Sequence, residues 1–419
     1  MERHLSRILE NELEETTQHQ ALYRGVDIIL PGKDGLRVEM ESRKLRLYLG
    51  IDATSPNLHI GHTVPLRKLR HFQELGHEVI LLFGGFTSLI GDPSDKSAVR
   101  IRLTSEQVEQ NMATYVDQAR KIVDLSSDCP NPITILNNNE WLSKLTLAEF
   151  IDIQANFTVQ QMLQRKMFQE RIEREKPIWL QEFSYPLMQG WDAVAMDVDL
   201  EIGGKDQLFN MLIGQTLLRR YKHHEKWVLG TKLIEDPAGK KMGKTEGDIV
   251  NILDWPEVKY ESIMTWPDSA IGVGFELITS VPLVTVKQIQ KEILPSILEG
   301  SSKIHPMELK ESLAFRTVSE LDGFENAEYA RDEFDRVKRK GELPRRIHEI
   351  FVEPGTYLSE VLVLAGWYQQ KEESARVVAS GSIFKDGKKV DKDFKITDDG
   401  DVLSIGKRTI GKIRRIRLL

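Results

Sequence analysis

The sequence predicts an α/β fold, in which a doubly wound domain built on a parallel sheet is followed by a mostly helical domain and a small α+β domain. Two short apolar runs, residues 45–52 and 78–86, flank a stretch with helical spacing at residues 62–76. A strand, a helix and a second strand in this order imply parallel strands joined by a right-handed crossover. The alternation of helical and strand-like patterns continues to residue 235, which favours a Rossmann-like parallel sheet.

The later elements of this first domain follow in order along the chain. Helical spacing over residues 105–125 precedes a strand-like run at residues 132–136. Residues 147–176 have helical spacing and are rich in Gln, Arg and Glu, which predicts a helical insertion. A further helix is expected at residues 207–221, and a strand follows at residues 226–234.

The pattern changes twice after this point. Residues 246–345 show helical period with little of the alternation that is typical of strands, so we expect a mostly helical domain. Residues 350–419 combine a helix-like stretch at 373–380 with a turn at 385–388 and short strand-like pieces, which predicts a small α+β domain. The first domain then spans residues 1–245.

Length and composition bound the class of protein. The 419 residues are too many for one ordinary domain, and 40% hydrophobic with 29% charged residues describes a globular protein with ample material for a core. Cys129, the single cysteine, permits no intrachain disulfide and argues for a reducing compartment. The N-terminal residues carry charges where a signal peptide needs an apolar stretch, and no apolar run reaches membrane-spanning length. We expect a cytoplasmic protein without a membrane segment.

The net charge of −7 is unevenly distributed along the chain. Residues 371–419 hold 13 Lys and Arg against 8 Asp and Glu, so a basic excess lies at the C-terminal end. Such a tail is either an ordinary solvated surface or a nucleic-acid contact, and its charge alone does not decide between them.

The first polar constellation is the stretch HIGH at residues 59–62, after the apolar run that ends at Asp52. Residues three apart share a face on a first helical turn, so His59 and His62 point together at a helix N-terminus, where unpaired N–H groups attract phosphate. Gly61 would let a flat base approach the backbone. Two ordinary surface histidines are the alternative reading, and a zinc site is less favoured because its coordination would be incomplete.

The second polar constellation, residues 238–248, is a glycine-rich and basic loop. It holds three glycines and three lysines: Gly239, Gly243, Gly247, Lys240, Lys241 and Lys244. The spacing is not that of a P-loop. Alone it describes an ordinary basic turn, but with HIGH upstream it favours a loop that grips a triphosphate and then releases pyrophosphate.

These two motifs carry a family resemblance. HIGH together with KMGKT at residues 241–245 is similar to the signature pair of the class I aminoacyl-tRNA synthetases. The stretches YLGIDATSPNLHIGH, GGFTSLIGDPS, EFSYPLMQGWD and LEIGGKDQLFN occur in the order found in bacterial tyrosyl-tRNA synthetases, so the sequence resembles that family over nearly its full length. The C-terminal stretch ESARVVASGSIFKDGKKVDKDFKI resembles the S4 RNA-binding module.

The resemblance implies an activity in two steps. L-tyrosine and ATP give tyrosyl-adenylate and pyrophosphate, and the tyrosyl group then passes to tRNA(Tyr). It also implies that Mg²⁺ accompanies ATP, although no protein ligand set for the ion is identifiable in the sequence. Residues 1–245 would be the catalytic domain, residues 246–345 the anticodon-binding domain and residues 350–419 the S4-like domain, in a homodimer formed through the insertion.

The resemblance assigns roles residue by residue. For the substrate, Tyr48 and Asp192 would bind the phenol, while Asp92, Tyr185 and Gln189 would hold the α-ammonium. Asp52 and Gln207 would complete the substrate site, Gln207 near the carboxyl group. The nucleotide contacts would be Gly50, Gly61, Gly204, Asp206 and Lys244, and the groups acting on the phosphates would be Thr54, His59, His62, Lys241, Lys244 and Thr245. Residues 185, 189 and 192 are spaced to share one helix face, as a pocket wall requires.

Four positions depart from the family pattern: Leu49, Ala53, Ser88 and Lys205. Lys205 adds a charge beside the expected ribose and carboxyl contacts, where it would point outward or meet a phosphate. A tryptophan-specific relative, or another with altered amino-acid specificity, is one alternative, but it would leave Tyr48 and Asp192 without a purpose. A catalytically silent synthetase-like RNA-binding protein is the other, and intact HIGH, KMGKT and Asp206 argue against it.

Overall fold

The computed structural model describes residues 16–93, 103–235, 250–302, 304–368, 370–406, 410 and 413–419. The chain separates into two compact units. Unit 1 comprises residues 1–243, 251–253 and 272–295, and unit 2 comprises residues 244–250, 254–271 and 296–419. The expected division into three domains stays a prediction.

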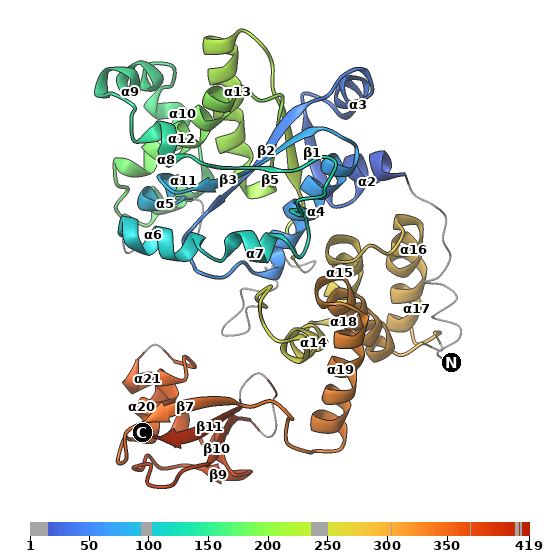
Figure 1. The fold of residues 1–419 in the computed structure, drawn as a ribbon, viewed down its shortest axis with the longest axis vertical. Coiled ribbons are helices and arrows are strands. Elements are labelled where there is room, and N and C mark those ends of the chain that lie inside the picture. The colour runs from blue at the N-terminus through green and yellow to red at the C-terminus, as the bar shows by residue number, and fades with distance from the viewer. Residues whose placement is uncertain are drawn as a thin grey trace. The chain divides into compact units, whose positions relative to one another are not determined.

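Unit 1 is built on a six-stranded sheet in the order β1-β6-β5-β2-β3-β4 (Figure 1). Its strands are β1 (Val26–Leu30), β2 (Arg46–Asp52), β3 (Glu78–Gly84), β4 (Thr134–Asn137), β5 (Leu200–Gly204) and β6 (Trp227–Thr231). Neighbouring strands are parallel, except that β1 and β6 are antiparallel. The sheet extends from β2 to β3 and β4 on one side and to β5 and β6 on the other. This confirms the predicted α/β class, and the point between β2 and β5 where the order reverses is where such sheets bind ligands.

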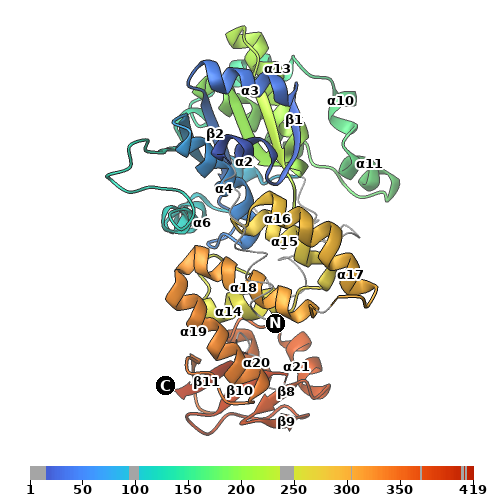
Figure 2. The same cartoon turned by 90° about the vertical axis from the view of Figure 1, so that its right-hand side faces the viewer.

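Helices cover both faces of this sheet (Figure 2). They are α2 (Thr17–Tyr23), α3 (Lys33–Ser42), α4 (Ile60–Glu74), α5 (Thr87–Ile90), α6 (Ser105–Met112), α7 (Tyr115–Ala119), α8 (Asn139–Leu142), α9 (Leu147–Gln154), α10 (Val159–Leu163), α11 (Lys166–Glu173), α12 (Gln181–Met196) and α13 (Leu208–Lys222). A 3-10 turn (Lys205–Gln207) precedes α13. Helices α15 (Ile271–Ile278) and α16 (Leu283–Gln288), with the π-helical turn Ile289–Ile293, belong to unit 1 apart from residue 271.

The alternation of side chains along β2 divides the core into two layers. Leu47 and Leu49 pack in one hydrophobic cluster with Leu69 of α4. Tyr48 packs in the other cluster with Leu187 of α12. The phenol of Tyr48 therefore lies on the face of the sheet that α12 and α13 cover.

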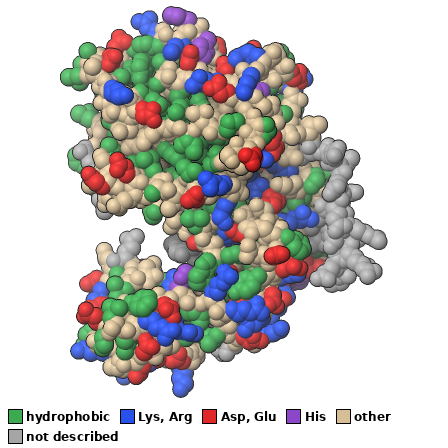
Figure 3. All heavy atoms as spheres, in the orientation of Figure 1, with side chains coloured by type: hydrophobic (Ala, Val, Ile, Leu, Met, Phe, Trp, Pro, Cys, Tyr) green, Lys and Arg blue, Asp and Glu red, His purple; other side chains and the backbone are tan. Residues whose placement is uncertain are grey.

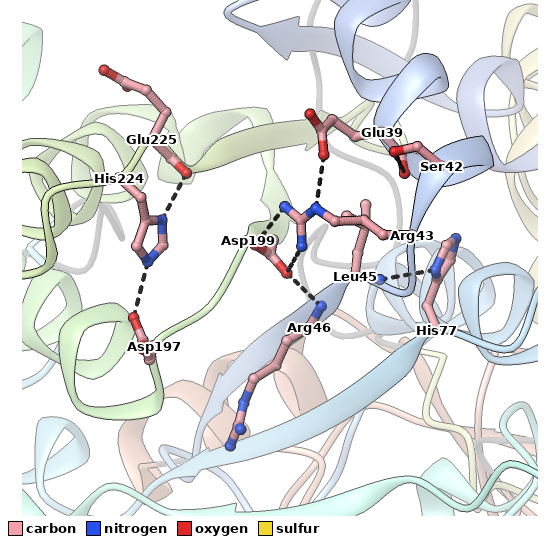
Figure 4. A network of polar contacts seen from close by, with 10 residues as sticks. All are labelled: Glu39, Ser42, Arg43, Leu45, Arg46, His77, Asp197, Asp199, His224 and Glu225. Carbon is pink, nitrogen blue, oxygen red and sulfur yellow. Dashed lines mark hydrogen bonds and ion pairs between the residues drawn. The ribbon is translucent and has the colours of Figure 1, made fainter.

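A polar network fixes the amino ends of the strands (Figure 4). The Asp199 carboxylate, directly before β5, accepts hydrogen bonds from Arg43 Nη2 and from the backbone N–H of Arg46, both at 2.8 Å. Burial lowers the pKa of His77, directly before β3, and its Nδ1 accepts the backbone N–H of Leu45 at 3.2 Å. These contacts hold the starts of β2, β3 and β5 in register, at the opposite edge from their carboxyl ends.

Unit 2 holds helices followed by a second sheet. The helices are α14 (Pro256–Met264), a 3-10 turn (Asp268–Ala270), α18 (Pro306–Asp322), α19 (Phe324–Phe334), a π-helical turn (Asp335–Arg339), α20 (Leu358–Leu364) and α21 (Lys371–Ala379), and α17 (Leu294–Leu298) crosses the unit boundary along the chain. The sheet, in the order β7-β11-β10-β8-β9, consists of β7 (His348–Val352), β8 (Ile383–Lys385), β9 (Lys388–Val390), β10 (Val402–Ile405) and β11 (Ile413–Leu418). Its β8–β9 hairpin turns at Asp386 and Gly387, both with positive φ, where the sequence predicted a turn.

Two local features differ from the sequence prediction. The helical pattern at residues 105–125 forms two short helices, because α6 ends at Met112 and the side chain of Thr114 donates to the carbonyl of Pro56. The edge strand β1 was not predicted at all. Among the described residues, no helix is both long enough and apolar enough to span a membrane.

Candidate active site

The candidate site lies at the carboxyl ends of β2 and β5, on the face that α12 covers. Strand β2 contributes Tyr48 and Asp52, and the chain leaving β5 contributes Gly204, Asp206 and Gln207. Helix α12 contributes Tyr185, Gln189 and Asp192, which share one face as their spacing predicted. The sheet thus brings together residues from three distant stretches of sequence.

The buried carboxylate of Asp192 is held in place by two donors. Trp141 Nε1 donates to Oδ1 at 2.8 Å, and Asn138 Nδ2 donates to Oδ2 at 3.1 Å. Burial raises the pKa of the Asp192 carboxyl well above its usual value, against the lowering effect of these two bonds. A further hydrogen-bond donor that enters the pocket would stabilise the ionised form of this carboxyl group.

Tyr48 presents a second buried polar group beside Asp192. Its side chain is 1% exposed, and its hydroxyl makes no well-formed hydrogen bond among the described residues. Burial raises the pKa of Tyr48, and the carboxylates of Glu201 and Asp192 raise it further. The hydroxyl therefore stays protonated, available to a polar group of a ligand.

Asp52 lies at the centre of a second group of contacts. Its carboxylate accepts from Tyr185 Oη at 2.9 Å and from Thr87 Oγ1 at 2.7 Å. Gly84 makes room for it, since a Cβ there would lie 2.0 Å from Asp52 Oδ1. The structure thus joins Tyr185 directly to Asp52, whereas the family pattern grouped Tyr185 with Asp92.

Asp92 contacts the residues that follow β5. Its Oδ2 accepts from Gln207 Nε2 at 2.5 Å, and Gln207 Oε1 accepts from Asn210 Nδ2 at 2.9 Å. The negative charge of Asp92 also helps to raise the pKa of Tyr185, so the two side chains are neighbours. Two of the three predicted ammonium-binding residues, Asp92 and Tyr185, therefore lie near the predicted carboxyl-binding residue Gln207.

The HIGH stretch caps helix α4 by a reciprocal arrangement. His59 Nδ1 accepts the backbone N–H of Gly61, and His62 Nδ1 accepts the backbone N–H of His59, both at 3.1 Å. The two rings lie 4.0 Å apart between centroids. Because each Nδ1 is an acceptor, each neutral ring carries its proton on Nε2 and can donate from there. A Cβ on Gly61 would lie 2.8 Å from His59 Cε1, so the glycine is required by the cap itself.

The remaining predicted nucleotide residues lie at the ends of the same strands. Gly50 is on β2, and Thr54 is exposed just beyond it. Gly204 ends β5, where a Cβ would lie 2.5 Å from Oδ1 of the exposed Asp206. Lys241, Lys244 and Thr245 lie outside the described residues.

Two departures from the family pattern have local explanations. Ser88 Oγ accepts the backbone N–H of Ala53 at 2.7 Å, so the serine fastens the loop after β2 to α5. Lys205 Nζ forms an ion pair with Glu235 at 2.9 Å, which raises the pKa of Lys205. The added charge is therefore compensated within the protein. Nothing in the structure explains Leu49.

Several residues of the site were missed by sequence reasoning. Asn138 lies between β4 and α8 and Trp141 lies on α8, and neither residue belongs to a motif. Arg165 is buried, stacks 4.9 Å from the ring centroid of Phe209 and leaves Nη1 without a hydrogen bond in the described structure. Burial lowers its pKa, against the raising effect of Asp92. A charged residue within an otherwise charged insertion gave no signal that it would be buried.

Metal binding has no visible support from clustered side chains. In the ranges that the structure describes, no group of three or more His, Cys, Asp or Glu could hold a metal ion. A magnesium ion that accompanies ATP binds chiefly to phosphate oxygens and water, so it does not require such a group.

The fold and the site together define a class I aminoacyl-tRNA synthetase. Residues 40–337 match the family described as "tRNA synthetases class I (W and Y)", and the chain belongs to that family. Among curated proteins, the chain is 37% identical to the tyrosine–tRNA ligase of Thermotoga maritima over 88% of this chain and 90% of that protein. It is 37% identical to the tyrosine–tRNA ligase of Moorella thermoacetica over 96% of this chain and 97% of that protein.

Solved structures show the same fold. A C-terminally truncated mitochondrial tyrosyl-tRNA synthetase of Aspergillus nidulans superposes with a TM-score of 0.62 at 21% identity, covering 80% of this chain and all of that one. The tyrosyl-tRNA synthetase of Archaeoglobus fulgidus, solved with L-tyrosine, gives a TM-score of 0.56 at 19% identity, covering 75% of this chain and 99% of that one.

Proposed function

We propose that this chain is a tyrosine–tRNA ligase, which activates L-tyrosine with ATP and transfers the tyrosyl group to tRNA(Tyr). The observation that carries the proposal is that two buried polar groups, the Asp192 carboxylate and the Tyr48 hydroxyl, lie near enough to each other for the charge of Asp192 to raise the pKa of Tyr48. A buried carboxylate can accept more than two hydrogen bonds, and the buried Tyr48 hydroxyl has no well-formed hydrogen bond among the described residues, so a ligand that pairs with both groups is preferred over one that pairs with neither. A phenol satisfies this condition and a plain benzyl group does not.

The substrate is held at its two ends by different groups. The phenol would donate to Asp192 and accept from Tyr48. At the other end, the α-ammonium would donate to Asp92, to Tyr185 and to the amide oxygen of Gln189. Asp52 supports this end through its bond with Tyr185. An ammonium donates at most three hydrogen bonds, which matches three acceptors around it.

The first reaction step needs positioning and charge stabilisation rather than a covalent enzyme intermediate. A carboxylate oxygen of tyrosine attacks the α-phosphorus of ATP, the bond to the bridging oxygen breaks, and pyrophosphate leaves. The Nε2–H groups of His59 and His62 would donate to phosphate oxygens at the N-terminus of α4, where the helix dipole also favours negative charge. Magnesium would bind ATP through its phosphates and reduce their charge.

The nucleotide and the phosphates would be bound by the ends of β2 and β5 and by the loop that follows. The ribose contacts are Gly204 and Asp206, the backbone contacts are Gly50 and Gly61, and Gln207 lies near the substrate carboxyl. Thr54, Lys241, Lys244 and Thr245 would contact the phosphates during the reaction. In the second step a ribose hydroxyl of the tRNA attacks the activated carbonyl, and AMP leaves.

RNA binding is proposed for the sheet formed by β7–β11. Strand β11 carries three arginines, Arg414, Arg415 and Arg417, and a strand rich in basic side chains can contact phosphates. Deleting residues 350–419 should leave tyrosyl-adenylate formation intact and abolish efficient charging of tRNA. Loss of both activities in a folded truncated protein contradicts this division of labour.

A homodimer is proposed on the basis of exposed apolar side chains in residues 147–180. Leu147, Val159, Trp179 and Leu180 are all exposed, and Leu180 is 85% exposed. Figure 3 shows hydrophobic side chains reaching the surface of unit 1 in several places. Exposed apolar groups gathered in one segment are typical of an interface. Leu180→Glu should convert a dimer to a monomer in sedimentation velocity, and a wild-type monomer contradicts the proposal. We also propose a cytoplasmic location, consistent with the free thiol of Cys129.

The test of the proposed activity is ATP–pyrophosphate exchange with each of the twenty amino acids. Tyrosine alone should support rapid exchange. Exchange with tryptophan instead would favour the relative of altered specificity. No exchange with any amino acid, together with tight binding of tRNA, would favour a catalytically silent RNA-binding protein.

A further inference from the structure

A buried ion pair lies beneath the proposed tyrosine pocket. Lys226, directly before β6, bonds through Nζ to Oε2 of Glu201 on β5, and both side chains are at most 2% exposed. Removing two charges from water is costly, and a buried ion pair is often no more stabilising than a neutral pair of similar volume. Stability alone is therefore a weak reason for this pair.

The surrounding backbone leaves little space around the pair. A Cβ on Gly214 of α13 would lie 2.6 Å from Lys226 Nζ and 3.5 Å from Glu201 Oε2. On α12, a Cβ at Gly190 would lie 3.0 Å from the backbone nitrogen of Gly214. Two glycines thus let α12 and α13 approach closely, with the lysine ammonium enclosed beside them. The close approach of the two helices therefore limits the space available to the ion pair.

The other oxygen of Glu201 connects the pair to the substrate site. Glu201 Oε1 accepts from Gln189 Nε2 at 3.0 Å. The amide oxygen of Gln189 is buried and has no hydrogen-bond partner in the described structure. An ionised carboxylate only accepts hydrogen bonds, so it holds the NH₂ group of the amide toward itself and the oxygen away. Gln189 lies between Tyr185 and Asp192 on the pocket face of α12.

We propose that Lys226 and Glu201 are a positioning pair that orients the Gln189 amide for recognition of the substrate ammonium. Lys226 Nζ holds Oε2 of Glu201 in place, so Oε1 accepts from the Gln189 NH₂ group and the amide oxygen of Gln189 is presented as an acceptor. Without the lysine, Oε2 of Glu201 loses the partner that fixes the carboxylate, and the Gln189 amide is free to turn its NH₂ group toward the ammonium. The inference rests on the proposed function, because it requires an ammonium at this place.

Three charged or titratable groups interact electrostatically with Glu201. They are Lys226 before β6, Asp192 on α12 and Tyr48, its register neighbour on β2. Lys226 is the cation that contacts Glu201 within this group. Its removal therefore takes away the cation that contacts Glu201 and that interacts electrostatically with Asp192.

The test compares two ligands that differ by the ammonium group alone, tyramine and 4-ethylphenol. Their dissociation constants are measured by calorimetry with the full-length wild-type protein and with Lys226→Met. The ratio of the two affinities should fall about tenfold in the variant, the effect of one hydrogen bond to a charged group. The affinity for 4-ethylphenol should stay within about twofold, because the phenol site is untouched.

Two further variants complete the design. The double variant Glu201→Gln/Lys226→Met removes both charges, which buried pairs commonly tolerate, so it keeps the test available if Lys226→Met does not fold. Its glutamine can donate or accept, so the ratio should fall here too. Lys259→Met is the matched control, because Lys259 forms a buried ion pair with Asp322 in unit 2. It should leave the ratio unchanged.

The outcomes separate the inference from the function on which it rests. An unchanged ratio in a folded Lys226→Met or double variant overturns the positioning role. An equal loss of affinity for tyramine and for 4-ethylphenol also overturns it, because such a loss shows a merely structural effect. A wild-type protein that binds neither ligand contradicts the proposed function itself, and the inference with it.

Discussion

Replacing Asp192 with asparagine tests the proposed recognition of the phenol. The carboxylate already accepts from Trp141 and Asn138, and a phenol hydroxyl would be its third donor. A hydrogen bond to a charged group contributes about 1.5–3 kcal/mol, and 1.4 kcal/mol is a factor of ten. The ratio of kcat/KM for tyrosine over phenylalanine should therefore fall about 10- to 100-fold in Asp192→Asn, since phenylalanine does not make the lost bond.

The assay is ATP–pyrophosphate exchange with tyrosine and with phenylalanine over a range of concentrations. Asp197→Asn is the matched control, because it is the same chemical change at the exposed end of α12, and asparagine tolerates the left-handed backbone there. The control should keep the wild-type ratio. A folded Asp192→Asn protein with the wild-type ratio would refute the assignment of Asp192 to the phenol.

Three further predictions follow from the geometry. Gly84→Ala places a Cβ 2.0 Å from Asp52 Oδ1 and should raise the KM for tyrosine more than the KM for ATP; equal effects contradict the role of Asp52. Gly61→Ala places a Cβ 2.8 Å from His59 Cε1, so adenylate formation in single-turnover experiments should slow about a hundredfold while equilibrium binding of tyrosine is preserved. Weakened tyrosine binding would contradict this assignment. Burial raises the pKa of Asp192, so the carboxyl group binds its proton more tightly in the native state than in the unfolded state. The contribution of this group to the free energy of unfolding of the wild type therefore decreases as the pH rises above about 4. The difference in free energy of unfolding in urea between Asp192→Asn and the wild type should therefore rise as the pH is raised above about 4, and a difference that does not change with pH refutes the raised pKa.

The central sheet could be predicted because its signal is local. Strands β2 and β3 are continuous apolar runs separated by an amphipathic helix, and this pattern implies their parallel pairing without any distant information. The N-terminal edge strand β1 gave no such signal. Its five residues carry Asp27 on an exposed edge, and its antiparallel pairing with β6 links residues about two hundred positions apart.

Only part of the candidate site could be predicted from the sequence, again because only some of its signals are local. Tyr185, Gln189 and Asp192 could be placed on one helix face from their spacing. Their supporting partners could not, because Trp141 reaches Asp192 across 51 positions of sequence and carries no motif. The partner of Tyr185 could not be predicted either, because Asp52 joins it only through the packing of α12 on β2. Contacts that depend on tertiary packing, rather than on spacing, define the limit of sequence reasoning here.

The most direct test of the account is isolation of the intermediate and its transfer to RNA. The protein is mixed with labelled tyrosine, ATP and pyrophosphatase, and the bound product is separated by gel filtration and then mixed with tRNA(Tyr). Labelled tyrosyl-adenylate should stay bound to the protein, and tRNA(Tyr) should remove the tyrosyl group as tyrosyl-tRNA, whereas a non-cognate tRNA should not. Absence of a bound adenylate, or a bound adenylate that tRNA(Tyr) does not discharge, would contradict the assignment of this chain as a tyrosine–tRNA ligase.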